Sequence, residues 1–130
     1  MAGGKPRQIA LDTLLRSQRQ QAAAERLLAD TFREAKLSSA DAGLARELVS
    51  GCVRWRRLLD WLIERATDGR EQKPAMQEIL RLGLYQIFFL NRIPDHAIAD
   101  ESVRLAKRNK CVGQAGFINA IIRRFLRDKE

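Results

Sequence analysis

The sequence predicts an all-α fold, with six or seven helices in a single domain. Apolar residues recur at intervals of three and four along nearly the whole chain, and no stretch alternates apolar and polar residues as a half-buried strand would. Pro6, Pro74 and Pro94 fall at the starts of periodic segments, where a helix tolerates proline. A chain of 130 residues is long enough to bury one core. We expect the domain to span residues 5–130, with residues 1–4 disordered.

The first two helices are predicted from short apolar stripes. Pro6 stands in a first helical turn, and the apolar residues after it indicate a helix that ends near Gln18. Leu28 and Phe32 lie four positions apart in the next periodic segment, so a second helix is expected over residues 22–36.

A capping signal starts the third helical segment. Ser38, with Asp41 three residues later, is typical of a helix N-terminus. Apolar residues then recur at helical spacing as far as Ala66, which predicts one long helix. Gly51 could kink or divide it, and this is why the expected number of helices is six or seven.

The remaining helices are separated by proline and glycine. Residues 74–91 are apolar nearly all round, so this helix is expected to be the central and most buried one. Asp95 is a candidate cap for a helix that runs to about Arg108. Gly113 and Gly116 precede the last apolar stripe, which predicts a final helix.

The charge distribution favours a polyanionic partner. The chain carries 24 Lys and Arg against 16 Asp and Glu, a net charge of +8, and each half holds 12 basic and 8 acidic residues. Arginine supplies 18 of the 24 cations, and its planar fork suits bidentate phosphate contacts. RNA or DNA is the simplest partner for such a surface. The alternative is a basic surface that serves solubility alone.

Catalytic, metal and membrane signals are weak in this sequence. No stretch reaches the roughly 18–20 uninterrupted apolar residues that cross a bilayer. Cys52 and Cys111 have no Cys or His at ligand spacing, and we expect reduced thiols in a cytoplasmic protein. His96 is the single histidine and has no nucleophile beside it, which favours a structural role. We expect no catalytic residue, no metal and no cofactor.

The basic residues near helix ends and near Trp55 are the candidates for RNA contact. Phosphates can be held there by cations, and unpaired bases can stack on exposed aromatic rings. Trp55 and Tyr85 are the candidate stacking residues, although the alternative places both in the core. The expected RNA-binding residues are Lys5, Arg7, Arg16, Arg54 and Arg57, followed by Arg123 and Arg124.

Arg54, Arg81 and Arg92 interrupt apolar runs. A partly buried arginine needs acceptors for its donors, so each could instead join helices by pairing with a carboxylate such as Glu47 or Glu101. For Arg81 and Arg92 this structural role competes with RNA contact.

Several segments together resemble the NusB family. Residues 47–55 and 59–63 are similar to the family's E-L-x-x-G-V-x-R-x…L-D-x-L-I segment. The family's later segments follow in its order, at residues 80–87, 92–97, 101–107 and 116–125. The resemblance covers about residues 5–127. It implies an all-helical fold of two small subbundles that binds RNA.

Within the family, the Arg-Trp, Tyr-Gln, Ile-Pro-x-His-Ala and Arg-Arg-Phe forms are most similar to the N-terminal domain of bacterial rRNA cytosine-5 methyltransferases of the RsmB (Sun/Fmu) type. The alternative that the resemblance leaves open is a transcription antitermination factor. Such a factor binds leader (boxA) RNA together with a small ribosomal protein. A homodimer is also compatible with a helical module of this kind.

The same resemblance bears on catalysis. The methyltransferases have a catalytic domain with an S-adenosylmethionine-binding sheet and with cysteines in Pro-Cys and Thr-Cys settings. Cys52 follows Gly51 and Cys111 follows Lys110, so neither setting occurs in this sequence. We therefore expect a module that is non-catalytic by itself, assists rRNA recognition, and has RNA and a methyltransferase catalytic domain as partners.

Overall fold

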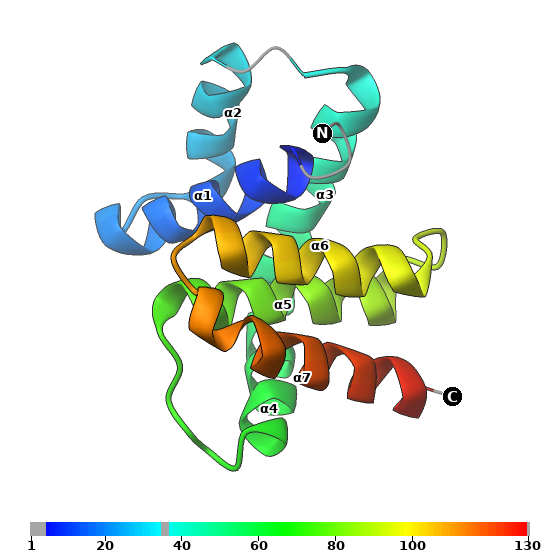
Figure 1. The fold of residues 1–130 in the computed structure, drawn as a ribbon. Coiled ribbons are helices and arrows are strands. Elements are labelled where there is room, and N and C mark those ends of the chain that lie inside the picture. The colour runs from blue at the N-terminus through cyan, green and yellow to red at the C-terminus, as the bar shows by residue number, and fades with distance from the viewer. Residues whose placement is uncertain (1–4, 35–36, 130) are drawn as a thin grey trace.

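Seven α-helices and one 3₁₀ turn make up the part of the chain that the structure, a computed structural model, describes, namely residues 5–34 and 37–129 (Figure 1). These residues contain no strand, which confirms the all-α prediction. The predicted disorder of residues 1–4 and the predicted helix end at Lys36 lie outside the described residues. The helices are α1 (Lys5–Gln20), α2 (Ala24–Glu34), α3 (Ser39–Arg54), α4 (Arg56–Ala66), α5 (Pro74–Phe89), α6 (Asp95–Arg108) and α7 (Ala115–Asp128), and the 3₁₀ turn is Val112–Gln114.

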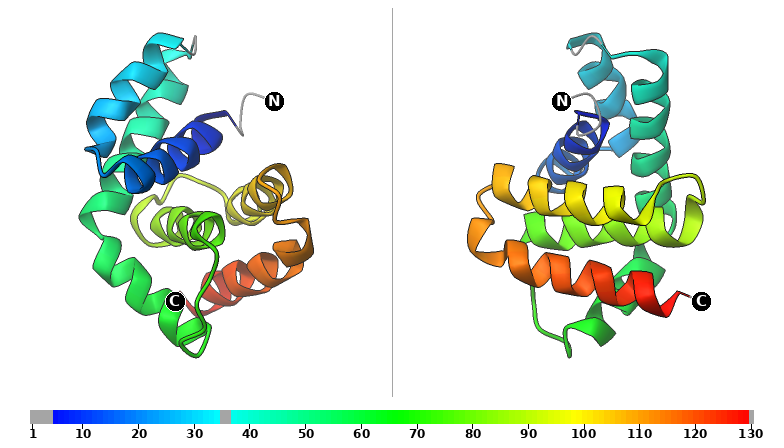
Figure 2. Two further views of the ribbon diagram at one scale, coloured as in Figure 1. Left: turned by 90° about the vertical axis from the view of Figure 1, so that its left-hand side faces the viewer. Right: turned by 45° about the vertical axis from the view of Figure 1, so that its right-hand side comes forward.

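The helices form two subbundles, as the resemblance implied. Helices α1, α2 and α3 pack on one another, while α4, α6 and α7 each pack on α5. Figure 2 shows the second group gathered around α5, with α2 and the start of α3 at the other end of the molecule. Helices α1 and α3 also contact α5, so the two subbundles share one continuous core.

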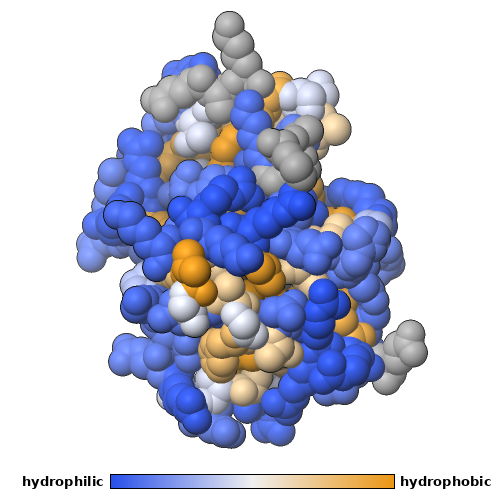
Figure 3. All heavy atoms as spheres, viewed as in Figure 1, coloured by the Kyte–Doolittle hydropathy of each residue, from blue (hydrophilic) through white to orange (hydrophobic). Residues whose placement is uncertain are grey.

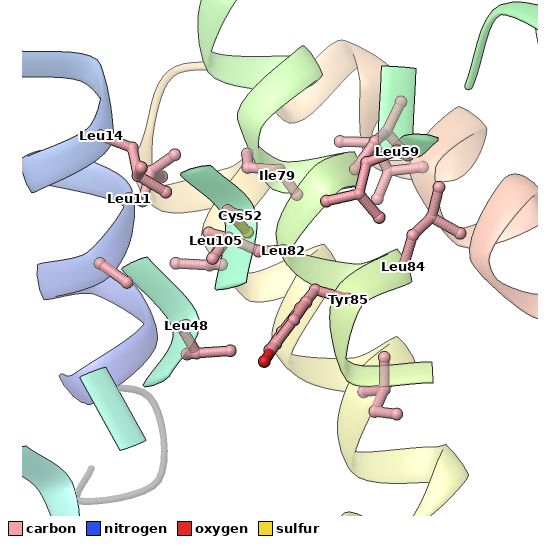
Figure 4. Packing of buried hydrophobic residues seen from close by; sticks show 14 of the residues in the cluster. Leu11, Leu14, Leu48, Cys52, Leu59, Ile79, Leu82, Leu84, Tyr85 and Leu105 are labelled. Carbon is pink, nitrogen blue, oxygen red and sulfur yellow. The ribbon is translucent and has the colours of Figure 1, made fainter. Parts of the chain in front are cut away.

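Helix α5 is the centre of that core, as its sequence predicts. The side chains from Glu78 to Ile87 are all buried. In Figure 4, apolar side chains of α1, α3 and α6 lie around those of α5, including Leu11, Leu48 and Leu105. A helix that is apolar nearly all round is stable only when neighbours cover every side of it, and five helices contact α5 here.

The long third segment is divided at Trp55, four residues after the predicted position at Gly51. Trp55 has φ −104° and ψ 19°, and it both ends α3 and precedes α4. Gly51 lies within α3, and the Tyr85 ring occupies the space where a larger residue at this position would project its side chain. The break turns α4 so that Asp60 meets Arg81 on α5.

The helix starts agree in part with the predicted caps. Ser38 caps α3, since its Oγ accepts a hydrogen bond from the Asp41 N–H at 3.1 Å. Asp95 is not a cap: Pro94 occupies that position, and Asp95 is the first helical residue of α6. Its carboxylate accepts a bond from Lys129 at 2.7 Å instead. None of the helices in the described ranges is long and apolar enough to cross a membrane.

Candidate nucleic-acid interface

The start of α1 and the end of α6 are joined by paired side-chain amides. Gln8 and Asn109 each donate one hydrogen bond to the other, both at 3.1 Å. The first turn of α1 therefore lies beside the last turn of α6. Five exposed cations lie in the first turn of α1, in the last five residues of α6, and two residues after α6. We call them the α1–α6 basic surface, and they are Lys5, Arg104, Lys107, Arg108 and Lys110.

The same region is strongly hydrophilic in the space-filling view. Figure 3, oriented as Figure 1, shows the most hydrophilic residues as a band over α1 and α6. Less polar residues lie below the band, toward α7. Exposed cations that lie on one face can bind the phosphates of a nucleic acid whatever its base sequence.

The buried carboxylate of Glu101 lies beside this surface, and the cations around it outnumber it. Its carboxylate pairs with Arg104 at 3.4 Å and with Arg108 at 3.9 Å, and it also interacts electrostatically with Arg7. One carboxylate thus faces three guanidinium groups. The Glu101 Oε2 atom is buried and accepts no hydrogen bond, so the charges around it hold the site together rather than a closed hydrogen-bond network.

Arg7 is not an exposed phosphate contact, which corrects the prediction for this residue. Its side chain is 6% exposed, and its Nε donates to Gln86 Oε1 at 2.9 Å. Gln86 in turn donates to the Leu82 carbonyl at 3.0 Å. Burial lowers the pKa of the Arg7 guanidinium, against the opposing effect of Glu101. Arg7 therefore joins α1 to α5.

The other predicted residues come from several helices and do not form one cluster. Lys5 is exposed at the start of α1, and Arg16 is half-buried in its second half. Arg123 and Arg124 are exposed on α7, across α6 from α1 (Figure 1). Arg123 lies 3.8 Å from Asp100, and Arg124 lies 3.9 Å from Asp128.

Arg54 and Arg57 flank the break between α3 and α4, at either side of Trp55; we call these three residues the α3–α4 corner. The guanidinium of Arg54 lies 5.7 Å from the centre of the Trp55 ring. Trp55 stacks on Phe89, and Phe89 stacks on Tyr85, each with ring centres 5.0 Å apart. Tyr85 is buried at 8% exposure, so the prediction that it could stack with a base is wrong, while Trp55 is 38% exposed.

Arg81 and Arg92 follow the structural alternative. Arg81 is buried and donates to Asp60 at 2.6 and 3.0 Å and to Glu78 at 2.9 Å. Burial raises the pKa of Asp60, but the hydrogen bonds from Arg81 and Gln77 outweigh that effect and hold it below its usual value. Arg92 pairs with Glu47 at 2.9 Å, one of the two carboxylates expected from the sequence.

The remaining reactive side chains are dispersed. Cys52 and Cys111 are free and buried, and burial raises the pKa of the Cys52 thiol. His96 is exposed in the first turn of α6. Among residues 5–34 and 37–129, no group of His, Cys, Asp and Glu could hold a metal ion.

Four residues of the basic surface escaped sequence reasoning. Arg104, Lys107, Arg108 and Lys110 fall within seven consecutive positions. This concentration of basic residues in the sequence could have indicated the basic surface. Lys5 is the one member of the surface that was predicted, and its position beside α6 depends on a contact between residues 101 positions apart.

Comparisons with known proteins place the chain in a family. The NusB family model matches residues 4–127. The chain is 34% identical over 123 residues to a probable ribosomal RNA small subunit methyltransferase B of Bacillus subtilis, covering 94% of this chain and 28% of the relative. It is 40% identical over 96 residues to the Synechocystis protein with the same description, covering 72% of this chain and 22% of that one.

A solved structure has the same fold. T. maritima NusB aligns with a TM-score of 0.88 at 22% identity, over 96% of this chain and 90% of that one. The chain spans about a quarter of the length of the two methyltransferase relatives. With a family model that matches nearly its whole length, this chain belongs to the NusB family.

Proposed function

We propose that this chain is an RNA-binding module that holds small-subunit rRNA on the α1–α6 basic surface. The observation that carries the proposal is the excess of exposed cations over carboxylates there. Within residues 5–34 and 37–129, Lys107 and Lys110 have no ion pair, and Arg104 and Arg108 both pair with Glu101. A phosphate backbone would supply the missing negative charge and release its counterions.

The relatives support rRNA as the particular RNA. The B. subtilis and Synechocystis proteins are described as rRNA small subunit methyltransferases, and this chain matches about a quarter of each. We infer that the module presents rRNA to a methyltransferase catalytic domain, takes no catalytic step itself, and acts in the cytoplasm. The α3–α4 corner and the α7 residues Arg123 and Arg124 would be secondary contacts.

The test is binding to a small-subunit rRNA fragment at two salt concentrations. Raising the salt from about 50 to 200 mM should weaken binding at least tenfold if several phosphates are neutralised. The double variant Lys107→Gln/Arg108→Gln should reduce the slope of log affinity against log salt by about 1.4 for single-stranded RNA, at about 0.7 per lost phosphate contact.

The matched control is Arg26→Gln/Arg33→Gln, which removes the same charge from exposed positions on α2. Its slope should stay within error of the wild type. Equal slopes for the two double variants would contradict the assignment of the surface. Binding that does not respond to salt would contradict the proposal as a whole.

Binding to leader RNA distinguishes the rRNA proposal from the alternative function in transcription antitermination. That function requires leader RNA and a small ribosomal protein, and a shared fold with T. maritima NusB does not distinguish it. The measurement is the affinity for leader RNA with and without that ribosomal protein. Tight binding to the rRNA fragment alone supports the rRNA proposal, whereas binding that appears only with the protein favours antitermination.

A further inference from the structure

Two aromatic rings of α5 and the ring at the break between α3 and α4 form a stack that ends at the protein surface. Tyr85 is buried, Phe89 is half-buried and Trp55 is exposed, so the stack runs from the core outward. The planes of Tyr85 and Phe89 differ by 17°, and those of Phe89 and Trp55 by 26°. Tyr85 therefore supports Phe89, Phe89 supports Trp55, and Trp55 is the outermost ring of the stack.

We propose that Trp55 is the stacking site for one unpaired nucleobase of RNA, with Arg54 and Arg57 contacting the phosphates on either side of that base. This inference rests on the proposed RNA binding and adds a single-stranded segment to what the protein recognises. It also gives the exposed tryptophan a partner, because every base has a π-face that stacks on an aromatic ring.

The support beneath Trp55 favours this assignment. An aromatic platform binds a base well when its own rotamer is already fixed, since little side-chain entropy is then lost on binding. The position of Trp55 is fixed twice, by the helix break in the backbone and by the Phe89 ring.

The charges at the α3–α4 corner favour RNA over a protein partner. Arg54 and Arg57 are exposed, and the carboxylate of this segment, Asp60, is engaged by Arg81 at 2.6 Å and by Arg56 at 4.0 Å. The Arg54 guanidinium lies over the indole, but a cation–π contact at an exposed site is weak. Arg54 can therefore leave the ring for a phosphate, or remain and present its own plane to a base.

The chain contains a matched control for this site. Trp61 is 53% exposed and has a cation, Arg65, 4.9 Å from its ring centre. Among the described residues, no other aromatic ring stacks on Trp61. The two tryptophans thus share exposure and a neighbouring arginine, and they differ in the support beneath the ring.

The first test uses the two single-tryptophan variants. Trp61→Leu leaves Trp55 as the fluorescent residue, and Trp55→Leu leaves Trp61. Adding a short single-stranded RNA at low salt should quench the emission of Trp55 and leave that of Trp61 unchanged. Quenching of Trp61 alone, or of neither residue by an RNA that does bind, would overturn the inference.

The second test measures affinity. Trp55→Leu should weaken binding of that RNA roughly 5- to 100-fold, Trp55→Phe by less, and Trp61→Leu not at all. The salt slope should not change in Trp55→Leu, since no phosphate contact is lost. Circular dichroism of each variant checks that it is folded.

A third test combines protein variants with modified RNA, and its measurements on the wild-type protein remain informative even if Trp55→Leu folds poorly. In the wild-type protein, replacing one nucleotide at a time by an abasic one should weaken binding sharply at a single position. That same position should cost less in Trp55→Phe protein, whose smaller ring still stacks, and little in Trp55→Leu protein, because there the two losses share one contact. If RNA binds with equal losses at every position, the stacking site is refuted while the proposed function stands. If no RNA binds, the proposed function fails first.

Discussion

Gly51 of α3 lies against the ring of Tyr85 on α5, with no room between them for a methyl group. A β-carbon at position 51 would lie 2.1 Å from Tyr85 Cζ and 2.2 Å from Cε1. Tyr85 cannot yield easily, because it is buried and its other neighbour is the stacked Phe89 ring. This contact sets how closely the two subbundles approach and supports the stack that ends at Trp55.

Gly51→Ala should therefore destabilise the protein although alanine is the better helix former. The added methyl group must displace a rigid ring, and overpacking of this kind costs about 1–3 kcal/mol, or more where nothing can move. Chemical denaturation monitored by circular dichroism gives the free energy of unfolding. An unchanged or higher value would show that α3 and α5 do not approach so closely.

Two other glycines of helices provide controls. Gly43 of α3 has no atom within 4 Å of an added β-carbon, so Gly43→Ala should stabilise the protein by about 0.4–1 kcal/mol. Gly83 of α5 would meet the end of the flexible Ile122 side chain at 2.4 Å, so Gly83→Ala should fall between the two. We therefore predict that the free energy of unfolding decreases in the order Gly43→Ala, Gly83→Ala, Gly51→Ala.

The Asp60–Arg81 pair should make stability depend on pH. Asp60 has a pKa below its usual 3.8 in the folded protein, so its contribution is present above that value and is lost as the pH falls through the folded pKa. Asp60→Asn should cost roughly 1–3 kcal/mol at pH 7, a range reduced because the carboxylate is 36% exposed. The variant and the wild type should converge only when the pH falls below the folded pKa of Asp60.

Thermal unfolding of both proteins between pH 7 and pH 2 measures this difference. Asp30→Asn is the control, because Asp30 pairs with Arg33 at an exposed position and exposed pairs contribute about 0–1 kcal/mol. A gap between Asp60→Asn and wild type that persists unchanged at pH 2 would mean that another group carries the effect.

Arg7 and Arg108 should separate stability from RNA binding. Arg7→Gln removes a buried, charge-assisted hydrogen bond to Gln86 and should cost roughly 1.5–3 kcal/mol of stability. It should leave the salt slope of RNA binding unchanged. Arg108→Gln should lower that slope with little change in stability. The two variants are compared by denaturation and by RNA titration, and a lower salt slope for Arg7→Gln would return Arg7 to the interface.

Cys52 should resist thiol reagents in the native protein. It is 2% exposed, and burial raises the pKa of its thiol, so little reactive thiolate forms at neutral pH. Mass spectrometry after brief treatment with iodoacetamide should find position 52 unmodified, and complete alkylation should follow unfolding in denaturant. Fast native alkylation would show that α3 opens readily.

The sequence by itself determined the helices and the course of the core. Helical periodicity is a local property, set by residues three and four positions apart, so α5, the Ser38 cap and the helical class could be predicted. Glu47 was one of two carboxylates named as candidate partners for Arg54, Arg81 and Arg92, and it pairs with Arg92, although the Arg92 side chain is exposed rather than partly buried. The family followed from several motifs in a fixed order.

The tertiary structure alone decided which cations face water. Arg7 and Lys5 are two positions apart, yet Arg7 reaches a glutamine 79 residues away in the core and Lys5 stays exposed beside α6. The same is true of the two aromatic candidates. Trp55 stands at the break between α3 and α4 and stacks on Phe89 of α5, whereas Tyr85 of α5 is buried against Gly51 of α3. Local spacing cannot specify such contacts, because they depend on how helices distant in sequence pack together.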